Sequence, residues 1–354
     1  MNKFLIFVLV LVVTACGNPQ KNKTVSTNVE DITLTGAGAT FPLPYYNLAF
    51  KMYKDSTGIA VTYGGIGSGG GIRSLKDQIV DFAGSDAFLS DQEIREMPAP
   101  TIHIPTCLGA VVLAYNLPEV KDLKLSGETI ADIYLGKITK WNDPRMKAIN
   151  PHTFLPDKPI HVVYRSDGSG TTYVFSDYLS KISEEWTTQV GTGKALKWPI
   201  GIAAKGNPGV AGTIRQTEGT IGYIGSEYAF ALKIPVASLQ NQAGNFITPG
   251  TASISAAASI ELPADTRAMI TNSPAADAYP ISCFTWMILY KEQAYNNRTQ
   301  QQAEASIRLL QWMLSDAAQR LTTKVHYSPL PSLTKENAKL LLQSVTFNGK
   351  PLLQ

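Results

Sequence analysis

Three glycine-rich turns contain the residue types in this 354-residue sequence that could bind a ligand. Each follows a short β-type run and precedes a helical pattern, and together they span residues 35–41, 64–71 and 165–172. The first backbone N–H groups of a helix lack partners within the helix, and the helix dipole adds positive potential there. Glycine lets the backbone approach a ligand closely. Three such helix starts that converge would form a site for an anion.

The polar side chains near these turns also have ordinary structural alternatives. Thr40, Ser68 and Ser169 are residue types that commonly cap a helix, and capping alone explains any one turn taken separately. The third turn also carries Arg165, whose guanidinium offers a planar fork of donors suited to tetrahedral oxyanions. A surface ion pair is the alternative role for Arg165, and a turn or cap role is the alternative for Asp86. The co-occurrence of all three turns favours the anion site.

A dinucleotide-dependent oxidoreductase is a competing interpretation of the second turn. Its residues 65–70 fit the pattern G-x-G-x-x-G after a strand, and Asp86 follows at a distance suited to a ribose contact. The exported N-terminus described below argues against it, because nicotinamide cofactors are scarce outside the cytoplasm. This interpretation also leaves the other two turns unexplained. A nucleotide-hydrolysing P-loop is not supported, since no G-x-x-x-x-G-K-[ST] occurs.

Catalytic interpretations of an anion site find little support in the residue patterns. Neither Ser68 nor Ser169 lies in a G-x-S-x-G motif. The histidines are scattered and form no metal-ligand pair: His103, His152, His161 and His326. We therefore expect a protein that holds its ligand, with no catalytic residue, no metal and no cofactor. An exported enzyme acting on phosphate esters stays open as an alternative.

The elements that must position these turns alternate along the chain. Strands are predicted at 32–35, 59–63, 80–84 and 160–164, and residues 107–115 form a long apolar run. Helices are predicted after the first glycine turn through about residue 53 and at about 72–79, 129–135, 303–321 and 336–342. This alternation predicts α/β layers with mainly parallel strands. The length predicts two domains. The formal net charge of +3 is too small to indicate a nucleic-acid partner.

The first residues predict export. Lys3 precedes an apolar run over residues 4–13, which is shorter than the roughly 20 residues that span a bilayer. Val13-Thr14-Ala15 before Cys16 resembles the bacterial lipobox, so we expect a signal peptide over residues 1–15 and lipidation of Cys16. Residues 16–32 are polar and are predicted to be a flexible tether. Whether the remaining cysteines, Cys107 and Cys283, form a disulfide is left open.

Several long, ordered motifs resemble the phosphate-binding protein family of the bacterial high-affinity phosphate ABC transporter. The similarity is dense from about residue 34 to 231, fades through about 280 and returns weakly afterwards. The matching stretches are residues 34–42, 65–70, 81–86, 133–138 with Trp141, 167–171, 190–193, 197–201 and 219–223. The resemblance implies a type II periplasmic-binding-protein fold of class α/β, with mixed sheets, a hinge and an interdomain cleft.

The resemblance also assigns roles to single residues and implies partners. It implies domain I over residues 33–106 plus 278–354 and domain II over 107–277. Its partners would be inorganic phosphate and a membrane permease with a cytoplasmic ATPase, for a monomer anchored in the cell envelope by its N-terminal lipid. The implied phosphate ligands are Thr40, Phe41, Ser68, Asp86, Arg165, Ser169, Gly170 and Thr171, with Asp167 orienting Arg165. Another oxyanion, such as molybdate or a carboxylate, is the alternative ligand.

Asp86 carries the expected preference for phosphate over sulfate. Phosphate keeps at least one proton at neutral pH, so a buried carboxylate can accept a hydrogen bond from it. Sulfate has no such proton and would face the carboxylate with lone pairs only. Sites built around one required hydrogen bond reject an analogue that lacks it by roughly 10⁴–10⁵.

Overall fold

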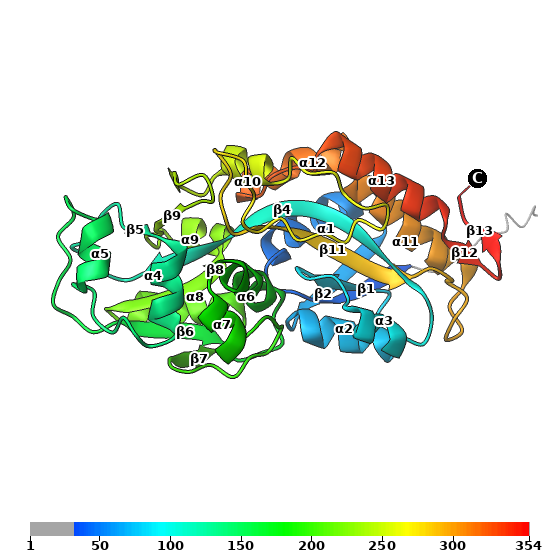
Figure 1. Ribbon diagram of the computed structural model, residues 1–354. Coiled ribbons are helices and arrows are strands. Elements are labelled where there is room, and N and C mark those ends of the chain that lie inside the picture. Colours follow the sequence, from blue (N-terminus) through cyan, green and yellow to red (C-terminus); the bar gives the residue numbers. More distant parts are fainter. Residues whose placement is uncertain (1–31, 354) are drawn as a thin grey trace, which may run out of the picture. The chain divides into compact units, whose positions relative to one another are not determined.

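A sheet of eight strands runs through residues 32–353, the part of the chain that the computed structural model describes (Figure 1). Across the sheet the order is β2 (Ala60–Gly65), β1 (Thr33–Gly38), β3 (Phe82–Ser85), β11 (Ser282–Tyr290), β4 (Thr101–Tyr115), β8 (Thr220–Gly225), β6 (His161–Arg165) and β7 (Ile202–Ala204). We call the part built around β1, β2, β3 and β11 lobe I, and the part built around β6, β7 and β8 lobe II.

The helices follow the division into lobes. Lobe I carries α1 (Leu43–Thr57), α2 (Ser68–Lys76), α3 (Asp91–Glu96), α11 (Gln300–Met313), α12 (Asp316–Thr322), the 3-10 turn Thr323–Val325 and α13 (Ser332–Gln343). Lobe II carries α4 (Gly127–Tyr134), α5 (Pro144–Ile149), α6 (Gly170–Ile182), α7 (Glu184–Gln189), α8 (Gly206–Gln216) and α9 (Ser226–Ala231). Helix α10 (Thr251–Ala257) packs on β4 and β11 (Figure 1).

Two small sheets complete the described residues. One has three strands, in the order β10 (Phe246–Ile247), β9 (Ser238–Gln240) and β5 (Lys124–Leu125). The other is the pair β12 (Thr346–Phe347) and β13 (Lys350–Pro351). Both are peripheral to the eight-stranded sheet that positions the site.

Strand β4 belongs to both lobes. Its first part, to Ala110, pairs antiparallel with β11, and from Val111 onward it pairs antiparallel with β8. Apart from Thr101, every residue of this 15-residue strand is buried, as is all of β11. A strand that is covered on both faces has a nearly continuous run of apolar residues in its sequence, as residues 107–115 do. The fold is therefore a two-lobed α/β structure whose halves share one strand.

The expectation of mainly parallel strands needs correction at the junction between the lobes. Strand β1 is parallel to β2 and β3, and β6 is parallel to β7 and β8. Strand β11 is antiparallel to both of its neighbours, β3 and β4, and β4 is also antiparallel to β8. The sheet is mixed because the chain leaves lobe I along β4 and returns to it along β11.

Other sequence-based boundaries shift for local reasons. The helix predicted over residues 303–321 is divided into α11 and α12, because the Ser315 hydroxyl accepts from the backbone N–H of Ala318 and starts a new helix. The helix predicted to reach residue 79 ends at Lys76. Cys107 and Cys283 are both free and buried, on the neighbouring strands β4 and β11.

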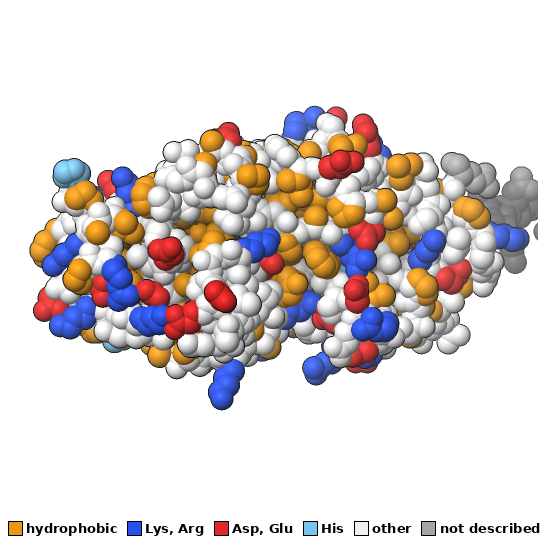
Figure 2. Space-filling view, viewed as in Figure 1, with side chains coloured by type: hydrophobic (Ala, Val, Ile, Leu, Met, Phe, Trp, Pro, Cys, Tyr) orange, Lys and Arg blue, Asp and Glu red, His pale blue; other side chains and the backbone are white. Residues whose placement is uncertain are grey.

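The predicted signal peptide, the lipidation site Cys16 and all but the last residue of the predicted tether lie outside the described residues. Within residues 32–353, no helix is both long enough and apolar enough to cross a membrane. Figure 2 shows acidic and basic side chains interspersed over one face of the protein, without a field of a single sign. An anion site must therefore depend on local groups.

His103 on β4 makes stability depend on pH. Its side chain is buried, and its Nε2 accepts a hydrogen bond from the backbone N–H of Leu89 at 3.1 Å. Burial, aided by the positive charges of Arg267 and Lys194, lowers the pKa of His103 to about 3. Because the unfolded chain binds this proton near pH 6.5 and the folded protein does not, stability is lost as the pH falls from 6.5 towards 3.

We predict that His103→Gln reduces the loss of stability between pH 6.5 and pH 3. The glutamine amide oxygen can still accept from Leu89, but it takes up no proton. Urea titrations measure the free energy of unfolding. The difference between the variant and the wild type should shift in favour of the variant by up to about 1.4 kcal/mol for each pH unit below 6.5. His152→Gln, at an exposed position, is the control. Parallel stability curves for His103→Gln and wild type would contradict the assignment.

Candidate functional site

The second and third glycine turns meet face to face, one from each lobe. The backbone N–H of Gly69 donates to the carbonyl of Gly168 at 2.9 Å, and the N–H of Gly170 donates to Ser68 Oγ at 3.0 Å. A Cβ added to Gly170 would come within 2.8 Å of Asp86 atoms. Gly67 has a φ of +86°, and a Cβ there would lie 2.4 Å from Asp167 Oδ2. These glycines permit a backbone approach that larger residues would block.

The capping alternative is wrong for Thr40 and Ser68. Helix α1 has Pro42 as its N-cap and α2 has Gly67, and neither helix has a side-chain cap. Thr40 Oγ1 instead accepts from the backbone N–H and the side-chain amide of Asn207, both at 3.1 Å. Ser68 is fully buried and accepts from Gly170, as described above. Both hydroxyls of lobe I therefore contact groups of lobe II.

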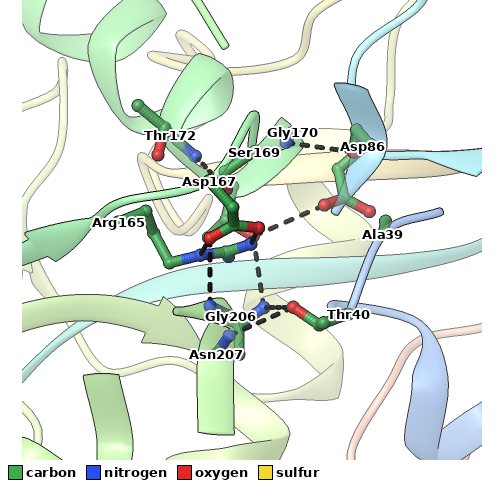
Figure 3. Close-up of polar contacts among 12 residues, drawn as sticks. Ala39, Thr40, Asp86, Arg165, Asp167, Ser169, Gly170, Thr172, Gly206 and Asn207 are labelled. Atoms are coloured by element: carbon green, nitrogen blue, oxygen red, sulfur yellow. Dashed lines mark hydrogen bonds and ion pairs between the residues drawn. The ribbon is translucent and has the colours of Figure 1, made fainter. Parts of the chain in front are cut away.

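The capping alternative is correct for the side-chain oxygen of Ser169. Its Oγ accepts from the backbone N–H of Thr172 at 3.0 Å and so caps α6. A hydroxyl that accepts in a cap still has a proton to donate. Ser169 is completely buried, and its residue lies at the meeting point of the turns (Figure 3). A cap and a ligand contact are thus compatible at this position.

Arg165 and Asp167 form a buried, two-point ion pair. Arg165 Nε donates to Asp167 Oδ1 at 2.8 Å and Nη2 donates to Oδ2 at 2.6 Å, with side-chain exposures of 1% and 12% (Figure 3). Burial alone would raise the pKa of Asp167, but the Arg165 guanidinium holds it below its usual value. Asp167 Oδ1 also accepts from the backbone N–H of Gly206 at 3.0 Å. The carboxylate thereby fixes the plane of the guanidinium.

Aromatic packing in lobe II holds the strand end that carries Arg165. The Tyr223 hydroxyl accepts from the Arg165 backbone N–H at 3.0 Å and bonds to the Thr172 hydroxyl at 2.7 Å. The Tyr223 ring stacks on Phe175 with centroids 4.5 Å apart. This links the end of β6 to the first turn of α6. The guanidinium and the helix start therefore keep a fixed relation to each other.

Asp86 comes directly after β3 and is buried, with 1% exposure. Its Oδ1 accepts from the Thr285 hydroxyl at 2.7 Å, and its Oδ2 accepts from the Thr171 hydroxyl at 3.4 Å. Burial raises the pKa of Asp86 to about 7, although Thr285, Arg165 and Thr171 each act in the opposite direction. Burial therefore opposes ionisation of Asp86, and the neighbouring hydroxyl donors and Arg165 favour it.

Thr171 joins the groups of the two lobes. Its Oγ1 donates to Asp86, and it accepts from Arg165 Nη1 and from the Asn207 side-chain amide, each at 3.3 Å. Sequence reasoning missed Asn207, which also accepts a bond from the Gly225 N–H at 3.0 Å. The fourth helix start, at α8, lacks a long glycine run; the only available signal was Gly206-Asn207-Pro208 opening a helical stretch.

The backbone of Phe41 and of the preceding Thr40 is held by tyrosines. The Tyr327 hydroxyl donates to the carbonyl of Phe41 at 2.5 Å, and the Tyr228 hydroxyl donates to the carbonyl of Thr40 at 2.6 Å. Among residues 32–353, the backbone N–H groups of Thr40 and Phe41 donate to no backbone carbonyl outside the helices and strands. N–H groups near a helix start can donate to an anion. All nine residues predicted for the site or its support therefore belong to one region.

The chemistry of this region favours holding an anion. The part of the chain that the structure describes holds no group of three or more His, Cys, Asp or Glu side chains placed to bind a metal ion. The turn that matched the dinucleotide pattern lies against the turn of lobe II, and Asp86 is bonded to Thr285 and Thr171. The arrangement therefore gives no support to a ribose contact by Asp86.

Comparisons with known proteins agree with this geometry. A family model described as "PBP superfamily domain" matches residues 18–317. The "Phosphate-binding protein PstS" of Haemophilus influenzae is 42% identical over 307 residues, which cover 85% of this chain and 89% of that protein. PstS of Pasteurella multocida is 38% identical over 329 residues, covering 91% and 94%.

Solved structures share the fold. A high-affinity periplasmic phosphate-binding protein, PfluDING, bound with phosphate, has a TM-score of 0.69 at 23% identity and covers 87% of this chain and 93% of its own. A phosphate-binding protein from Stenotrophomonas maltophilia has a TM-score of 0.65 at 19% identity, with the same coverage. The chain belongs to the PBP superfamily of periplasmic binding proteins and, within it, to the PstS family of phosphate-binding proteins.

Proposed function

We propose that this protein binds inorganic phosphate between its two lobes and delivers it to the permease of an ABC importer. The observation that carries the proposal is a buried carboxyl, Asp86, placed beside a buried guanidinium, Arg165, where several helix starts meet. The donors come from the helix starts and from Arg165, and Asp86 is the acceptor for the proton of the ligand. The membership of the chain in the PstS family supports the same ligand.

The proposed ligand set comprises Thr40, Phe41, Ser68, Asp86, Arg165, Ser169, Gly170 and Thr171, oriented by Asp167. To it we add Asn207, whose amide lies between the hydroxyls of Thr40 and Thr171. The site has donors for the oxyanion but lacks an activated nucleophile. We therefore propose binding without chemical turnover, and the protein should not hydrolyse a generic phosphomonoester.

Closure of the lobes over the ligand is part of the proposal. Thr40, Ser68 and Asp86 stand in lobe I, and their partners Asn207, Gly170 and Thr171 stand in lobe II. Every one of these contacts would be lost if the lobes separated. The domain division at residues 106/107 and 277/278 stays a prediction; the pairing of β4 changes from β11 to β8 between Ala110 and Val111.

Export and anchoring are proposed from the sequence. A signal peptide over residues 1–15, lipidation of Cys16 and a tether over 16–32 would hold the monomeric protein at the cell envelope, within reach of the permease and its ATPase. The small net charge of +3 suits a carrier that selects its ligand by a defined site.

Titration calorimetry with phosphate and then sulfate tests the proposed function. The protein is first stripped of bound anion, and its fold is verified by circular dichroism. We expect one-to-one binding of phosphate and no heat with sulfate at the same concentrations. Folded, empty protein that gives no heat with phosphate would contradict the proposal, and molybdate, carboxylates and dinucleotides would then be titrated.

Arg165→Ala should weaken phosphate binding by about 2–5 kcal/mol, because it removes a buried charged donor and leaves Asp167 without its partner. The affinity is measured by the same calorimetry. Arg145→Ala is the control, since Arg145 also pairs with aspartates of lobe II but its side chain is 46% exposed. An affinity of Arg165→Ala within twofold of wild type would remove this residue from the site.

Asp86→Asn should lose discrimination more than affinity. Thr285 can still donate to the remaining side-chain oxygen, which turns the new amide towards Thr171 and the ligand. The amide can donate to sulfate, so the affinity ratio of phosphate to sulfate should fall by at least about 100-fold. Competition titrations measure the ratio, with Asp91→Asn at an exposed position as the control. If Asp86→Asn still rejects sulfate fully, the Asp86 carboxyl does not distinguish the two ions by the proton of phosphate.

A further inference from the structure

A lysine of lobe II forms an ion pair with a glutamate of lobe I beside the candidate site. Lys194 lies between α7 and β7, and its Nζ is 2.8 Å from Glu93 Oε1 and 2.7 Å from Glu93 Oε2. Glu93 belongs to α3, on the other side of the strand shared by the lobes. The same ammonium also lies 3.5 Å from the carbonyl of Phe88. One side chain of lobe II thus meets three oxygens of lobe I.

Both ends of this contact are fixed to the candidate site. The carbonyl of Lys194 accepts from the backbone N–H of Ser169 at 2.8 Å, so Lys194 is attached to the third glycine turn. Glu93 Oε2 accepts from the N–H of Ser90 at 2.8 Å, within the capping box of α3. Ser90 follows Asp86 by four residues on the loop from β3. The pair therefore joins the loop after Asp86 to the turn before α6.

The surroundings of the pair differ from those of an ordinary surface pair. The side chains of Lys194 and Glu93 are 13% and 30% exposed, whereas those of Lys137 and Glu185, both in lobe II, are 41% and 42% exposed. The Lys194 ammonium also lies over the ring of Tyr173 on α6, 5.6 Å from its centroid. Partly desolvated ion pairs are screened less by salt and contribute more than exposed ones.

We propose that Lys194 and Glu93 form a latch between the lobes that sets the rate at which phosphate is released. The pair can form only when the lobes are closed, because its two members stand on opposite sides of the shared strand. A contact made only in the closed state raises the closed population and so the apparent affinity. It acts on dissociation more than on association, since the lobes meet after the ligand has entered. The proposal rests on the proposed function.

The latch is tested with Lys194→Met, Glu93→Gln and the double variant. Methionine keeps the apolar stem of the lysine and removes the charge. Glutamine keeps an oxygen for the Ser90 cap and removes the opposite charge. Lys137→Met is the matched control, because it breaks an ion pair within lobe II only. Thermal unfolding of each variant verifies that it is folded, and Glu93→Gln alone carries the test if Lys194→Met does not fold.

The measurements are the phosphate affinity by calorimetry and the release of radiolabelled phosphate after a chase with unlabelled phosphate. Each single variant should release phosphate about 3- to 10-fold faster, between the small effect of an exposed pair and the large effect of a buried one. The association rate should stay within about twofold. The double variant should behave like the single variants, because either change already breaks the pair. Added salt should speed release from the wild type more than from the variants.

The outcomes separate the latch from the proposed function. Wild type that binds phosphate while both single variants release it at the wild-type rate would overturn the latch alone. Effects of the two single variants that multiply in the double variant would show that the residues act independently, which also overturns it. Wild type that binds no phosphate would overturn the proposed function and, with it, a latch for phosphate.

Discussion

The structure depends on holding three charged side chains, Asp86, Arg165 and Asp167, away from water in one place. Each buried charge must find partners, because an unpaired one costs several kcal/mol. Asp167 and Arg165 satisfy each other through two parallel hydrogen bonds, and hydroxyls from both lobes satisfy Asp86. The Asp86 carboxyl takes its hydrogen bonds from hydroxyl groups, and burial raises its pKa to about 7. Its proposed role is to accept a hydrogen bond from a ligand that brings its own proton.

Strand β4 connects the two lobes that carry the proposed site. Because it pairs with β11 on one side and with β8 on the other, each lobe keeps its own buried sheet while the chain between them stays continuous. The proposed ligand groups lie at strand ends and helix starts on opposite sides of this strand. In the proposed mechanism, closing the lobes brings donors and acceptor together, and the Lys194–Glu93 pair opposes their separation.

The sequence predicted the α/β fold class from local signals, and the same signals point to several residues of the proposed site. Glycine turns between strand and helix patterns mark the positions of Ser68 and Arg165, and the apolar run at 107–115 marks β4. Asn207, Thr285 and Tyr228 were missed, because their contacts with the site span 36 to 199 residues of sequence and leave no local pattern. Ser169 was predicted either to cap a helix or to bind the ligand, and the sequence could not choose between these roles. Its contacts show the cap on α6, and the ligand contact stays a proposal. The direction of β11 could not be predicted, since it depends on how the chain returns to lobe I.

The central claim is that phosphate is bound between the lobes with its proton directed to Asp86. The most direct test is a crystal structure of the purified protein grown with phosphate. We expect a phosphate ion among Thr40, Ser68, Arg165 and the start of α6, with one oxygen within hydrogen-bond distance of an Asp86 carboxylate oxygen. A phosphate bound elsewhere, or one in this place with the Asp86 carboxyl turned away from it, would contradict the account.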